Sequence, residues 1–163
     1  MTDRQDGRHF TRHCEEIINS LPMRFPFELT AFLAAVGEQR GVSITLWRMT
    51  PGRCGRTGML LRTYRQIYVL VTSKTDPVHV SHIAFHELGH LLLGHGSDRG
   101  CATAGQSRSD CEREEEVQAE RFAYLLSAHV RAGVAQHRRR GSRAQVQLRA
   151  AFGSRRHLCG GYA

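Results

Sequence analysis

Residues 83–93 read Ile-Ala-Phe-His-Glu-Leu-Gly-His-Leu-Leu-Leu, an apolar run with an HExxH pattern at positions 86–90. Residues four apart on an α-helix lie on one face, so His86 and His90 can direct their imidazoles at one metal ion. Glu87 lies one step round the helix, next to that point. In zinc hydrolases the metal lowers the pKa of water, and such a Glu takes the proton as the water attacks a carbonyl. The pattern therefore predicts a zinc-dependent hydrolase.

A third metal ligand is predicted on a second helix, in a segment of good helix formers that spans residues 112–126. Here Glu116, Ala119, Glu120 and Ala123 fall on one stripe of the helix. The small alanines allow a close approach to the HExxH helix, so Glu116 can complete a His, His, Glu ligand set that leaves one position for water. Glu120, one turn further on, can accept a hydrogen bond from the outward nitrogen of a ligand histidine and fix its orientation.

The acidic residues of this segment also allow a simpler interpretation. A cluster of carboxylates is typical of a helix face that is exposed to water, and the cluster comprises Glu112, Glu114, Glu115, Glu116 and Glu120. Glu115 is the alternative ligand, but it lies about 100° round the helix from Glu116 and off the alanine stripe. We therefore prefer Glu116.

Two further histidines lie close to the pattern. His95 is the fifth residue after His90, whereas the third ligand of the HExxHxxGxxH pattern is the sixth residue after the second histidine. Gly94 is also expected to end the helix before His95. We therefore do not expect His95 to bind the metal. His82 lies one turn before His86, where it can touch the site or belong to a partly exposed first turn.

The two segments together resemble the ImmA/IrrE family of metallo-endopeptidases. The likeness rests on the motif HELGHLLLGH at 86–95, on Glu-x-Gln-Ala-Glu-x-Phe-Ala at 116–123, and on the leucine pair that follows at 125–126. It covers about residues 42–130. Two positions of the second motif differ, since Gln118 stands where the family commonly has Glu, and Glu120 where it has Asp or Asn.

This resemblance implies a gluzincin-like zinc protease fold. It assigns the metal ligands to His86, His90 and Glu116 and the general base to Glu87. It also implies a substrate class, because family members typically cleave a helix-turn-helix repressor or an antitoxin. Such cleavage switches on mobile-element transfer, a stress response or a toxin–antitoxin module.

The length of 163 residues is that of one domain. We expect a metallopeptidase domain over residues 1–135, with its core at about 42–130, and a basic tail over 136–163. A cytoplasmic protein is expected, because no apolar run reaches the length of a membrane span and the first residues are polar. The 5 cysteines form no CxxC pair and are expected to be free thiols, with a Cys101–Cys111 pairing left open.

The formal net charge of +8 is concentrated at the C-terminus, where no Asp or Glu occurs after Glu120. Such a basic stretch can attract nucleic acid or an acidic protein. Nucleic-acid binding is not favoured, for two reasons. Lys74 is the only lysine, so the arginines are typical of a GC-rich coding sequence, and the tail has few aromatic residues that could stack on bases.

The pattern of apolar residues predicts an α+β, zincin-like fold. Helices are expected at 9–20 and 28–39, from Thr75-Asp76-Pro77 into the HExxH segment, from 112 to about 130, and at 143–152. Strands are expected at 42–47, 59–63 and 66–72, in a small antiparallel sheet whose edge can pair with an extended peptide.

The function that these patterns favour is a zinc endopeptidase that cleaves a regulatory protein. The alternative is a zinc-containing regulatory module that binds a protein or nucleic acid without proteolysis. A metallohydrolase for small substrates would use the same chemistry. The residue that stabilises the oxyanion is left open among Tyr64, Tyr68, Tyr124 and His129.

Overall fold

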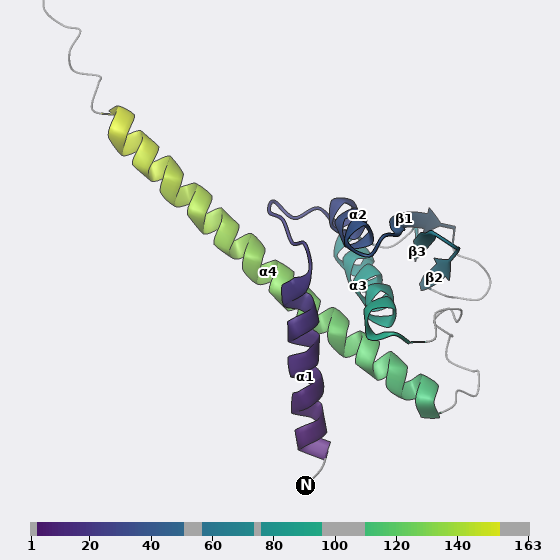
Figure 1. Cartoon of the computed structure of the whole chain (residues 1–163). Coiled ribbons are helices and arrows are strands. Elements are labelled where there is room, and N and C mark those ends of the chain that lie inside the picture. Colours follow the sequence, from purple (N-terminus) through teal and green to yellow (C-terminus); the bar gives the residue numbers. More distant parts are fainter. Residues whose placement is uncertain (1–2, 51–56, 74–75, 96–109, 154–163) are drawn as a thin grey trace, which may run out of the picture.

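The computed structural model describes residues 3–50, 57–73, 76–95 and 110–153. In these ranges the chain forms four helices and a three-stranded sheet, which confirms the α+β prediction (Figure 1). The elements in chain order are α1 (Asp3–Ser20), α2 (Leu29–Gln39), β1 (Ser43–Met49), β2 (Gly58–Arg62), β3 (Gln66–Thr72), α3 (Pro77–Leu93) and α4 (Asp110–Gly153). No helix in the described ranges is both long and apolar enough to cross a membrane.

The sheet is mixed, with the strand order β1-β3-β2. β2 and β3 pair antiparallel, as predicted for these two strands. β1 pairs with β3 in parallel, so the prediction of an antiparallel sheet was wrong for this strand. The reason is that sequence neighbours need not pair, and the central place goes to the most apolar strand. That strand is β3, in which Ile67, Val69 and Val71 are all buried.

Two capped helices cover the inner face of the sheet, α2 against β1 and α3 against β2 and β3. The Glu28 carboxylate accepts hydrogen bonds from the first backbone N–H groups of α2, and the Asp76 carboxylate does the same for α3. Pro77 opens α3, and Gly94 ends it in the left-handed conformation with φ 77°. The predicted start and end of the HExxH helix are thus confirmed.

α3 packs against the first half of α4 through small residues. A Cβ added to Gly89 of α3 would lie 3.2 Å from the Ala119 carbonyl oxygen and 3.2 Å from the Phe122 ring of α4. The side chains of Ala119, Phe122 and Ala123 are fully buried at this contact. The predicted alanine stripe therefore does face the HExxH helix and sets the separation of the two helices.

α4 is a single helix of 44 residues, so the prediction of two separate helices at 112–130 and 143–152 was wrong. No proline lies between these segments, and their Ala, Arg and Gln residues are good helix formers that tolerate Gly133 and Gly141. α4 crosses the predicted boundary between residues 135 and 136 without a break.

Cys14 of α1 is a free thiol and is fully buried in the core. Burial raises the pKa of this thiol, because a thiolate would lose its hydration there. Its role is therefore to pack against the neighbouring apolar side chains. The side chains of Cys101 and Cys111 lie outside the described residues, so their pairing stays open.

Candidate metal centre

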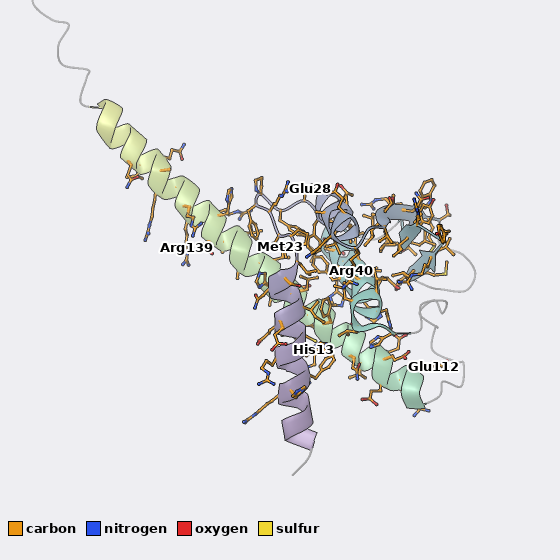
Figure 2. The ribbon with its side chains drawn as sticks, viewed as in Figure 1. His13, Met23, Glu28, Arg40, Glu112 and Arg139 are labelled. Carbon is orange, nitrogen blue, oxygen red and sulfur yellow. The ribbon has the colours of Figure 1, made fainter. Side chains whose placement is uncertain are left out.

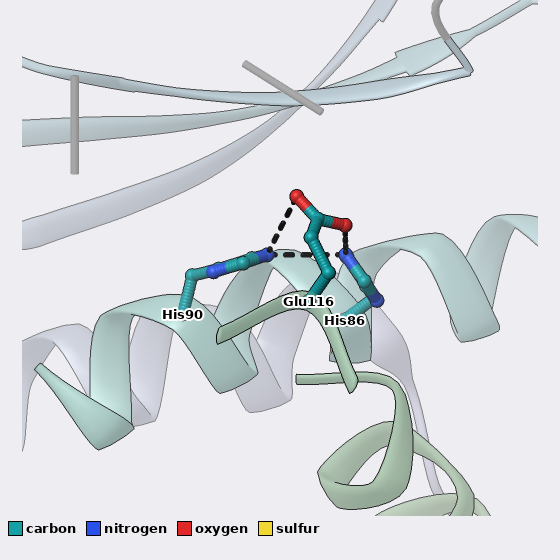
Figure 3. Close-up of side chains that lie close together, drawn as sticks. All are labelled: His86, His90 and Glu116. Atoms are coloured by element: carbon teal, nitrogen blue, oxygen red, sulfur yellow. Dashed lines mark hydrogen bonds and ion pairs between the residues drawn. The ribbon is translucent and has the colours of Figure 1, made fainter. Parts of the chain in front are cut away.

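Three side chains from two helices converge on one point. α3 supplies His86 and His90, whose Nε2 atoms lie 3.1 Å apart, and α4 supplies Glu116 (Figure 3). The Glu116 carboxylate oxygens lie 3.5 Å from the His86 Nε2 and 3.8 Å from the His90 Nε2. One donor atom from each residue lies within 4.8 Å of the other two, an arrangement that could hold a metal ion. Glu115, the alternative ligand, is not in this group.

The spacing of these donors fits a small tetrahedral ion. Two ligands bound to zinc at about 2.0–2.1 Å in tetrahedral geometry lie about 3.3 Å apart. The three separations of 3.1, 3.5 and 3.8 Å bracket that value. Two imidazole nitrogens and a carboxylate oxygen are also a donor set that zinc accepts. The residues present therefore fit zinc in both distance and chemistry.

The outward nitrogen of His86 is held by a carboxylate of α4. The Nδ1 atom of His86 lies 3.2 Å from the Oε2 atom of Glu120. The other oxygen of Glu120 lies 3.1 Å from the Nε2 atom of His82, whose ring contacts Tyr124 at a centroid distance of 5.1 Å. A proton on the His86 Nδ1 that is donated to Glu120 leaves the Nε2 lone pair free for the metal.

The outward nitrogen of His90 is held by a chain of three further side chains. The His90 Nδ1 lies 3.1 Å from the His95 Nδ1, and the His95 Nε2 lies 3.1 Å from the Gln118 Oε1. The Gln118 amide nitrogen then donates to Glu114 at 3.2 Å. If the His90 Nε2 binds the metal, its Nδ1–H donates to His95, whose Nε2–H donates to Gln118. The ring N–H groups of His90 and His95 then each meet an acceptor.

Sequence reasoning set His95 aside and gave Gln118 no role, and the structure places both beside His90. His95 is not in the group of possible metal ligands, as expected, and the predicted helix end at Gly94 adopts the left-handed conformation. This turn folds the chain back, and the His95 backbone N–H donates to the His90 carbonyl at 3.0 Å. Because a left-handed Gly reverses the direction of the chain, the Gly94-His95 pair was the signal available in the sequence.

Glu87 is buried between α3 and the sheet, with 2 % of its surface exposed. It lies against the backbone of Gly58 in β2, since a Cβ added to Gly58 would come within 2.8 Å of the Glu87 Oε1 and would collide with Ile83. β2 therefore needs a glycine at this point to leave room for the carboxylate. In Figure 3 the side chains of His86 and His90, from α3, and of Glu116, from α4, meet on the side of α3 that faces the strands.

The charges around His86 act on its pKa in opposing directions. Burial lowers the pKa of His86, while hydrogen bonds to Glu116 and Glu120 and the negative charges of Glu116 and Glu87 raise it. The net effect is a raised pKa. In the metal-free protein these carboxylates favour a proton on the same imidazole that a metal ion would bind, so the two compete.

The candidates for oxyanion stabilisation have different surroundings. Tyr64 is 92 % exposed between β2 and β3, with the Arg65 guanidinium over its ring. Tyr124 contacts His82, which Glu120 links to His86. Tyr68 lies on β3, and His129 is exposed on α4. Of the four, Tyr124 is the one whose contacts lead to a ligand histidine.

No known protein-family model matches this chain, and no curated protein sequence is significantly similar to it. The assignment therefore rests on the residues and their geometry. The group His86, His90 and Glu116, carried by two packed helices beside a small sheet, fits a zincin-like metal centre.

Proposed function

We propose that this protein is a zinc-dependent endopeptidase of the HExxH…E type. The observation that carries the proposal is the convergence of the His86 and His90 Nε2 atoms with the Glu116 carboxylate, while the outward nitrogens of both histidines are held by other side chains. A buried Glu87 beside this group adds the residue that a hydrolase needs as a base. A site that only stabilises the fold has no use for such a base.

In this proposal His86, His90 and Glu116 hold the zinc ion. Bound zinc supplies Lewis acidity, which lowers the pKa of water and polarises a carbonyl. The Glu87 carboxylate takes the proton from the attacking water and passes it to the amine nitrogen of the scissile peptide. Its burial between α3 and β2 keeps it in one position, so the proton transfer needs little reorganisation.

The substrate backbone has a docking edge close by. Within the described residues β2 pairs with β3 at one end of the sheet, and an edge strand of this kind is the element to which an extended peptide can add. Gly58 at the start of β2 touches Glu87, so a peptide added along this strand passes beside the general base. This arrangement supports cleavage of an extended chain and favours a peptide over a small substrate.

The proposed substrate is a regulatory protein, either a helix-turn-helix repressor or an antitoxin. This step is supported by the resemblance of the two motifs to the ImmA/IrrE family. It is independent of the metal chemistry, so a different protein substrate would leave the proposed reaction intact.

The test compares wild type with Glu87→Gln, which removes the base but keeps the size of the side chain. We expect purified samples of both to bind one zinc ion per chain by mass spectrometry under native conditions. In host cells, a small set of new protein N-termini is expected with wild type and not with Glu87→Gln. These N-termini would also identify the substrate.

Two results would contradict the proposal. Loss of zinc from Glu87→Gln would mean that this residue is a ligand and not a base. The same new N-termini with both proteins would mean that another protease makes them. Zinc binding by both proteins without any new N-termini would instead favour the regulatory binding module.

A further inference from the structure

The second half of α4 extends away from the rest of the protein as a basic helix (Figure 1). The last described contacts with the body are those of Phe25, which lies against Gly133 and stacks on His137 at a centroid distance of 6.4 Å. From Arg138 to Gly153 the helix continues for about 24 Å at 1.5 Å per residue. We call residues 138–153 the arm; all of its residues from 138 to 147 are exposed.

The arm carries positive charge on more than one side. Its exposed arginines are Arg138, Arg139, Arg140 and Arg143. At 100° per residue they span about 200° of the helix circumference. Figure 2 shows Arg139 on this part of α4, with its side chain directed away from the other elements. The sequence has no acidic residue after Glu120 that could neutralise these charges within the arm.

The other residues of the arm decide which acidic partner fits it. Between and after the arginines stand Gly141, Ser142, Ala144, Gln145, Val146 and Gln147. The large apolar residues of the arm are Val146, Leu148 and Phe152, so large apolar residues are fewer than arginines in the arm and offer little surface for burial against a protein. Phe152 is the one aromatic residue in the sequence of the arm, so the arm has a single ring for stacking on unpaired bases. Neither a protein interface nor single-stranded nucleic acid is therefore favoured.

Duplex nucleic acid matches the remaining properties. The major groove of DNA is about 12 Å wide and admits an α-helix, with a phosphate backbone on each side. Arginines that span about 200° of a helix can reach both backbones from within the groove. We propose that the arm binds duplex DNA through its phosphates, without regard to base sequence. This inference does not depend on the proposed protease activity, because Glu116 lies about 33 Å from Arg138 along α4.

The experiment measures binding of the full-length, zinc-loaded protein to a labelled duplex of arbitrary sequence by fluorescence anisotropy at several salt concentrations. Four phosphate contacts predict a slope of log K against log salt of about −3.6, or a loss of affinity of about 150-fold between 50 and 200 mM salt. In the arm variant, Arg138, Arg139, Arg140 and Arg143 are replaced by Gln, which keeps a good helix former at each position.

A control variant removes the same charge elsewhere, by replacing four exposed arginines with Gln: Arg8, Arg24, Arg40 and Arg48. We expect the arm variant to lose most of the slope and the control to keep it. Equal losses in both variants would overturn the proposal, because they would reflect net charge alone. Unchanged binding by the arm variant, or binding to polyglutamate but not to the duplex, would overturn it as well.

Discussion

The two halves of α4 differ in composition and in surroundings, although they form one continuous helix. The first half carries Glu114, Glu116 and Glu120 and packs against α3 through Ala119 and Phe122. The second half carries the arginines of the arm and is exposed from residue 135 to 147. Helix formation is therefore common to both halves, and it does not distinguish the half that carries a candidate metal ligand from the half that extends away from the other elements.

What distinguishes the halves is the partner that each one meets. The carboxylates of the first half lie beside histidines of α3, and these contacts restrict both sets of side chains. The charges of the second half meet water, so their energetic contribution to folding is small. The predictions below use matched pairs of substitutions along α4, and the largest expected effect comes first.

The first comparison concerns apolar side chains. Phe122 is fully buried and Val146 is 64 % exposed. We expect Phe122→Ala to lower the free energy of unfolding by about 3–5 kcal/mol, because it leaves a cavity in the core. Val146→Ala should change it by less than about 0.5 kcal/mol. Urea denaturation of both variants measures the difference, and a large effect of Val146→Ala would show that the arm is packed in solution.

The second comparison concerns the metal. Glu116→Gln removes a charged ligand, so zinc affinity should fall by more than about 100-fold, which exceeds the usual effect of losing an outer hydrogen-bond partner. Glu115→Gln alters the neighbouring carboxylate and should leave the affinity unchanged. Competition with a chelating dye measures both variants. Equal losses would assign the effect to the acidic face as a whole and would reject Glu116 as the ligand.

The third comparison concerns two glutamines. Gln118 accepts the hydrogen bond of His95, which in turn holds His90. Gln118→Ala should therefore weaken zinc binding by about 10–100-fold while the protein stays folded. Gln145→Ala on the exposed arm should have no effect on zinc. Unaltered affinity of the Gln118→Ala variant would mean that His90 is held in place without this chain.

The smallest effects are expected at two glycines, where the sign of the change in stability distinguishes the covered part of α4 from the exposed part. A Cβ at Gly133 would collide with Phe25, so Gly133→Ala should destabilise the protein by about 1 kcal/mol. Gly141 has nothing within 4 Å of an added Cβ, so Gly141→Ala should stabilise the helix by about 0.5–1 kcal/mol. Thermal unfolding followed by far-ultraviolet circular dichroism detects both changes, and a decrease in stability for Gly141→Ala would place that residue in a contact.

Much of the candidate site could be predicted because its signals are local. His86 and His90 share a face of α3 through their spacing, and Asp76 and Gly94 fix where that helix begins and ends. The stripe of Glu116 and Ala119 likewise follows from helical periodicity. The contact of His95 with His90 was not predicted, since it depends on a left-handed turn and on a partner, Gln118, in another helix.

The HExxH helix, its caps, the strands β2 and β3 and the face of α4 that carries Glu116 could all be predicted, because each depends on residues that are close in the chain. The tertiary structure was needed to show that Glu116 meets the two histidines and that β1 pairs in parallel with β3. It also decided which part of α4 is covered and which is exposed. These features depend on how segments far apart in the sequence pack, and packing is a sum of many small contacts that no local pattern specifies.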